Sequence, residues 1–142
     1  MAEQTIMIAM KTAQQVGEEK EATEITTEAT YNYSPLKQII TYQEKTPEEG
    51  MIETVITVDR LPQKPIITLE RKGAYHNSMT VQQGVRHQNL YHMGPCDFTM
   101  GVYGNTVACS LEENRGSLFL SYALDINSTH ASTNTLELSI KP

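Results

Sequence analysis

A regular alternation of apolar and polar residues near the C-terminus limits the fold of this chain more than any other feature. Between residues 116 and 127 every second residue is apolar and large. These residues are Leu118, Leu120, Tyr122, Leu124 and Ile126. A period of two is that of a β-strand with one buried face, whereas a helix needs apolar residues three and four apart. The segment therefore predicts a half-buried strand.

The same period recurs along the rest of the chain. Alternating sets lie at residues 6–10, 25–31, 36–42, 52–58, 67–71, 98–102, 107–111 and 136–140, with weaker signals near 79–81 and 90. β-Branched residues, which favour strands, make up 35 of the 142 residues. The one local helix signal, from Thr46 to Gly50, can hold a single turn.

These observations predict an all-β fold. We expect a single antiparallel, up-and-down β-barrel of about 8–10 strands, forming one domain over residues 1–142. Short polar connections of the hairpin type separate the sets, and no helices are predicted that could connect parallel strands. The chain is long enough to bury one core of its own.

Charge, composition and the lack of targeting segments argue against several kinds of partner and against export or membrane insertion. The formal net charge is −6, so we expect binding neither to nucleic acid, which attracts basic surfaces, nor to anionic membranes. The N-terminus lacks the basic and apolar regions of an export signal, and no apolar run is long enough to cross a bilayer. Two cysteines, Cys96 and Cys109, cannot form a disulfide framework. We expect a soluble, cytoplasmic protein with free thiols.

Motifs for catalysis or for cofactors are not found. The chain has no nucleophile elbow, Walker loop or dinucleotide-binding glycine motif. Its four histidines lack metal-ligand spacing; His87 and His92, five apart, would lie on opposite faces of one strand. We therefore expect no metal, no cofactor and no enzymatic activity.

One group of polar residues falls on the same alternating positions, that is, has the same parity, as the apolar residues of its strand. If that parity marks the inner face, Tyr42, Glu44, Arg71 and Tyr122 point into the barrel, together with Gln38 and Thr54. Buried charges must be paired, so Glu44 and Arg71 could form a structural ion pair. Alternatively, Arg71 with Tyr42 or Tyr122 could bind the carboxylate or polar head of an amphipathic ligand. Parity alone leaves both interpretations open.

Several strings of residues together point to a known family: Tyr42-Gln43-Glu44, Glu70 to Gly73, Met79 to Gly84, Leu90-Tyr91, and above all Gly116 to Asn127 and Ser132 to Ile140. With these strings the chain resembles the YwiB-like family of uncharacterised proteins of Gram-positive bacteria. The resemblance covers nearly the whole chain and implies a calycin, or lipocalin-like, β-barrel. It implies no catalytic residues and no established cellular role. Where the family commonly has Tyr-x-Thr-Pro-Tyr-Gly, this chain differs, from Tyr91 to Asp97.

Two functions remain in view. The first is a binding module whose interior holds a small apolar or amphipathic ligand, because small barrels are wide enough for one such molecule. The proposed ligand-binding residues are Tyr42, Glu44, Arg71 and Tyr122. The second is a filled barrel that acts through its surface or as a homodimer, for which Phe119 and Ala123 offer a partly apolar outer face.

Overall fold

The computed structural model describes residues 3–47, 50–61, 63–93 and 95–141, and within them it is all-β, without helices. The ten strands are β1 (Glu3–Val16), β2 (Glu19–Ser34), β3 (Lys37–Thr46), β4 (Gly50–Asp59), β5 (Ile66–Lys72), β6 (His76–Gln82), β7 (Arg86–Met93), β8 (Cys96–Cys109), β9 (Ser117–Ile126) and β10 (Thr129–Lys141). The all-β prediction is confirmed. Thr46 and Gly50 pair with each other across a hairpin, while Glu48 and Glu49 of the expected helical turn lie outside the described residues.

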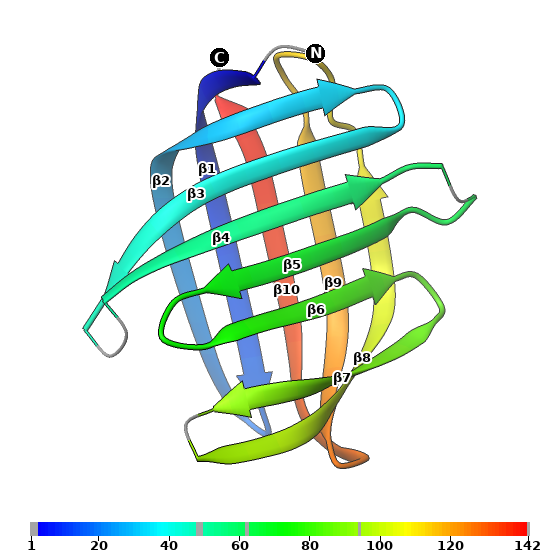
Figure 1. The fold of residues 1–142 in the computed structure, drawn as a ribbon. Coiled ribbons are helices and arrows are strands. Elements are labelled where there is room, and N and C mark those ends of the chain that lie inside the picture. Colours follow the sequence, from blue (N-terminus) through cyan, green and yellow to red (C-terminus); the bar gives the residue numbers. More distant parts are fainter. Residues whose placement is uncertain (1–2, 48–49, 62, 94, 142) are drawn as a thin grey trace.

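All ten strands form one antiparallel sheet in the order β6-β5-β4-β3-β2-β1-β10-β9-β8-β7. Apart from β6 and β7, each strand pairs with the next in sequence, and β1 also pairs with β10, so the topology is up-and-down, as predicted. β2 pairs with the whole of β1, but it pairs with β3 only from Thr30 to Ser34. Its two ends therefore belong to two groups of strands that cross at a steep angle and enclose the interior (Figure 1).

The two edge strands, β6 and β7, follow each other in sequence and meet where the barrel closes (Figure 1). No ladder joins them in the part of the chain that the structure describes. Gly104 of β8 contributes to the closure, because its carbonyl oxygen accepts a bond of 2.8 Å from the Gly84 amide. Its own amide donates to the Val85 carbonyl oxygen at 3.3 Å. The barrel is thus nearly closed.

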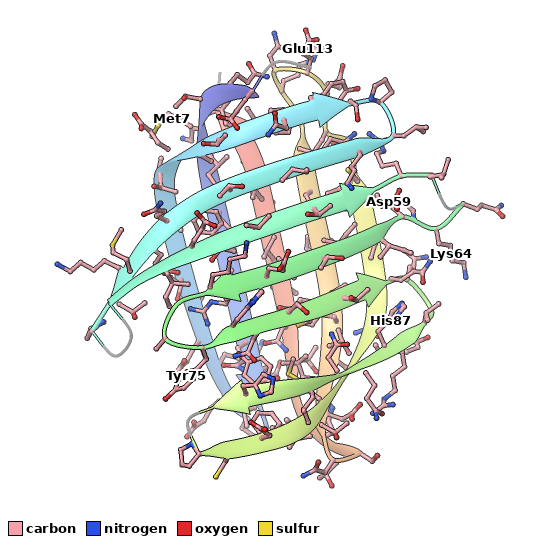
Figure 2. All side chains as sticks on the ribbon, in the orientation of Figure 1. Met7, Asp59, Lys64, Tyr75, His87 and Glu113 are labelled. Carbon is pink, nitrogen blue, oxygen red and sulfur yellow. The ribbon has the colours of Figure 1, made fainter. Side chains whose placement is uncertain are left out.

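The interior is apolar at one end, and a loop covers that end. Leu118 and Leu120 of β9 are 0% exposed, as their parity predicted. Leu111, in the loop between β8 and β9, packs into the same core. The Tyr31 hydroxyl donates to the Glu112 carbonyl oxygen at 2.6 Å, and Arg60 Nη1 donates to the Leu111 carbonyl oxygen at 3.1 Å. Figure 2 shows Glu113 of this loop at the end of the barrel where both termini lie.

An ion pair on the outer face ties β7 to β9 across β8. Arg86 Nε and Nη2 lie 2.9 and 2.6 Å from the two carboxylate oxygens of Asp125. The guanidinium covers Gly101 of β8, where any Cβ would collide with it. Because of the hydrogen bonds from Arg86, the pKa of Asp125 is lowered, and the pKa of Arg86 is raised in turn. The pair therefore holds the edge strand β7 against β8 and β9.

Replacing Asp125 with asparagine should reduce stability in a pH-dependent way. Since the folded protein lowers the pKa of Asp125, its contribution is fully present above the unfolded value of about 3.9. That contribution is lost as the pH falls through the lowered folded value. The unfolding free energies of wild type and Asp125→Asn should therefore differ at pH 7 and converge in acid. Urea titrations at several pH values measure this; a difference that stays constant down to acid would contradict it.

Candidate functional site

A pocket of about 180 Å³ lies where the closing strands meet, at the part of the interior away from the covering loop. Its walls come from β5 and β6 on one side and from β7, β8 and β9 on the other. The apolar lining residues are Leu69, Met79, Met100 and Leu124. The polar lining residues are Arg71, Asn77, Ser78, Tyr91 and Tyr122. Two of the four residues predicted to bind a ligand, Arg71 and Tyr122, thus line one pocket.

Register explains how the inward residues meet. Tyr42 of β3 lies opposite Thr54 of β4, which lies opposite Arg71 of β5, which in turn lies opposite Asn77 of β6. These four residues form one row across the inner face of the sheet. Within this row Arg71 is an exposed side chain at the rim of the pocket, whereas Tyr42 and Thr54 are buried.

The ion pair between Glu44 and Arg71, one of the two interpretations of the sequence, is not formed among the ion pairs of the described residues. Glu44 lies opposite Ile52, while Arg71 lies opposite Thr54. The two charges are therefore two strands apart, about 9.6 Å across the sheet, and offset along it by two residues. Glu44 is half-buried and does not line the pocket.

The tyrosines of this region influence one another across the interior. Burial raises the pKa of Tyr122 to about 12, and the neighbouring Tyr42 and Tyr91 contribute to the rise. Burial also raises the pKa of Tyr42, with a smaller opposing interaction from the Thr54 hydroxyl; Glu44 raises it further and Arg71 lowers it. Both phenols are thus protonated and neutral at physiological pH. Tyr42 therefore lies near enough to Glu44, Arg71 and Tyr122 to interact with each of them.

Several polar groups here lack strong protein partners. Thr54 Oγ1 is buried without a hydrogen bond of standard geometry, although the Tyr42 hydroxyl lies near enough to interact with it. The Tyr42 hydroxyl makes a weak contact of 3.8 Å with the sulfur of Met10. Neither Arg71 nor Tyr122 has a side-chain hydrogen bond to any residue that the structure describes. Buried polar groups are normally satisfied, so such groups mark a candidate binding site.

Two asparagines close the wall of the pocket between β6 and β7. Asn77 Nδ2 donates to the His92 carbonyl oxygen at 2.9 Å, and Asn77 Oδ1 accepts from the His92 amide at 2.8 Å. Asn89 Nδ2 donates to the Ser78 carbonyl oxygen at 3.1 Å. These side chains satisfy backbone groups that a strand ladder would otherwise satisfy. Tyr91 is held beside them by stacking on Phe98, with ring centroids 5.3 Å apart.

A second hollow, of about 420 Å³, lies on the outside where β2 and β3 separate. Threonines and the carboxylates of Glu28 and Glu53 form much of its wall. Most of these positions have outward parity, so the hollow is a polar surface groove that lacks the apolar floor of the interior pocket. No group of three or more potential metal ligands occurs within residues 3–47, 50–61, 63–93 and 95–141.

Comparison with known families identifies the chain. The model of a family described as "Domain of unknown function (DUF1934)" matches residues 8–138. The chain belongs to the DUF1934 family. No curated protein matches the sequence.

A solved structure is similar to this DUF1934 protein over almost its whole length. The ywiB protein from Bacillus subtilis matches with a TM-score of 0.76 and 19% identity, covering 99% of this chain and 94% of that one. This likeness confirms the fold and agrees with the resemblance seen in the sequence. A protein of unknown function from Bacteroides ovatus also matches, with a TM-score of 0.36, 8% identity and coverage of 98% and 41%, which is too distant to support an argument. No helix in the described residues is long and apolar enough to span a membrane.

Sequence analysis missed the residues that β6 and β7 contribute to the pocket of this DUF1934 protein. Both strands are short, and their alternation was weak because each is half-buried at an edge. Gly84 separates the segment that contains Asn77 from the segment that contains Asn89, so a turn between two strands could have been expected there. Nothing in the sequence, however, indicates that asparagine side chains take the place of a ladder.

Proposed function

We propose that this DUF1934 protein is a cytoplasmic binding module that holds a small amphipathic molecule in the interior pocket, and that it acts by binding and not by catalysis. The observation that carries the proposal is that one pocket has both an apolar lining and two polar side chains, Arg71 and Tyr122, without hydrogen bonds to any described residue. Ligand sites generally combine a mainly apolar lining with a few convergent polar groups.

The size of the pocket limits the ligand to a small molecule. Its volume is about 180 Å³. Sites for drug-sized ligands are larger, about 300–1,000 Å³. The side chains of Met79 and Met100 are flexible and could adapt to the shape of the occupant.

Native mass spectrometry of freshly purified protein tests the proposal. We expect a reproducible mass increment that disappears after extraction with organic solvent. Met79→Trp should abolish the increment because the indole fills the pocket, whereas Thr80→Trp, the next residue on the opposite face of β6, should retain it. A wild-type protein without any increment, or an increment that both variants retain, would remove the pocket as the site of binding.

A further inference from the structure

The charged and polar groups of the pocket all favour a negatively charged ligand head. Arg71 is the one charged side chain among the residues that line it, and it has no ion-pair partner in the described part of the chain. A guanidinium offers five donors in a planar fork that matches a carboxylate. In a chain with a net charge of −6, an arginine left unpaired at the rim of a pocket is the feature to explain.

The remaining polar groups of the wall supply donors. With its pKa raised to about 12, the Tyr122 hydroxyl keeps its proton and can donate it in a hydrogen bond. The amide of Asn77, which could otherwise act as an acceptor, is engaged by the His92 backbone. The wall therefore combines a free hydroxyl donor with a positive charge and contains no carboxylate.

The opposing part of the pocket is apolar, and nearby charge limits the ligand to a single negative charge. Leu69, Met79, Met100 and Leu124 offer a surface for a short hydrocarbon tail. Glu44 lies outside the pocket but close enough to raise the pKa of Tyr42. Arg71 alone can balance one negative charge, whereas a phosphate dianion would leave a second charge unbalanced, and the nearby Glu44 would repel it further.

We infer that the pocket binds a monocarboxylate with a short apolar tail, whose carboxylate accepts hydrogen bonds from Arg71 and Tyr122 while its tail lies against Met79, Met100 and Leu124. This inference rests on the proposed function, since it names the class of molecule that the same pocket holds. Charge-assisted hydrogen bonds of this kind are stronger than neutral ones.

Binding of four eight-carbon compounds tests the inference by isothermal titration calorimetry at pH 7. Octanoate should bind at least about tenfold more tightly than octan-1-ol, which has the same tail without the charge. Octylamine should not bind measurably, because its cation would face Arg71. Octyl phosphate should bind more weakly than octanoate. If octanol binds as tightly as octanoate, the carboxylate inference is wrong, while the proposed amphipathic site stands.

Variants separate the role of Arg71 from general effects of charge. Arg71→Gln should remove the preference for octanoate over octanol, and Tyr122→Phe should reduce it by a factor of a few. Lys72→Gln, which removes the neighbouring exposed cation from the opposite face of β5, should keep the preference. Thermal unfolding checks that each variant is folded. A preference that survives Arg71→Gln would overturn the inference; if none of the four compounds binds and no native ligand is found, the proposed function fails as well.

Discussion

Replacing Gly104 with valine should lower the free energy of unfolding by about 3 kcal/mol or more, because the side chain would force the closing strands apart. A Cβ at this position would collide with the Gln82 carbonyl oxygen. To relieve that collision, β8 must move away from the end of β6. The backbone hydrogen bonds that Gly104 makes with Gly84 and Val85 would then be lost. Urea denaturation at pH 7 measures the change, and Gly104→Ala should give an intermediate value.

Gly17 provides the matched control. It lies in the turn between β1 and β2 with a φ of 61°, and a Cβ there would meet nothing within 4 Å. Gly17→Ala should therefore cost only the strain of a left-handed residue, about 1–2 kcal/mol. If Gly104→Val costs no more than Gly17→Ala, the close approach of β8 to β6 does not hold the barrel closed.

Gly104 also shows why the sequence predicted most of the fold but not the closure. Apolar positions fall on even numbers from Phe98 to Val102 and on odd numbers from Val107 to Leu111. This change of parity suggested two strands separated by a turn at Gly104-Asn105. The structure instead has one strand, β8, with a register shift between Gly104 and Thr106. A bulge inserts one residue and moves later side chains to the other face, so it produces the same pattern as a break.

The candidate site was partly predictable for a related reason. Parity correctly placed Tyr42 and Thr54 on the inner face and brought Arg71 into the same row. It could not give the offset between strands, so it could not separate Glu44 from Arg71. It also treated the interior as equally buried along its length. Arg71 is exposed, and Tyr122 is only half-buried, because this part of the interior opens into the pocket.

Truncation of Leu120 to alanine should cost about 2–5 kcal/mol, since it leaves a cavity in the packed end of the barrel. Leu120 is 0% exposed and belongs to the core beneath the covering loop. Phe119, the next residue, faces outward and is only partly buried. Phe119→Ala should therefore cost less, even though it removes a larger side chain. Urea unfolding of both variants at pH 7 measures the difference; the reverse order would place the core on the wrong face of β9.

Leu124 extends this comparison along the same face of the same strand. It has the parity of Leu120, so the sequence pattern alone predicts similar costs for the two truncations. Leu124, however, is half-buried and lines the pocket, where space already exists. Leu124→Ala should thus cost clearly less than Leu120→Ala, because little new cavity forms. Equal losses would mean that the interior is packed at both ends, and the pocket on which ligand binding depends would be filled in solution.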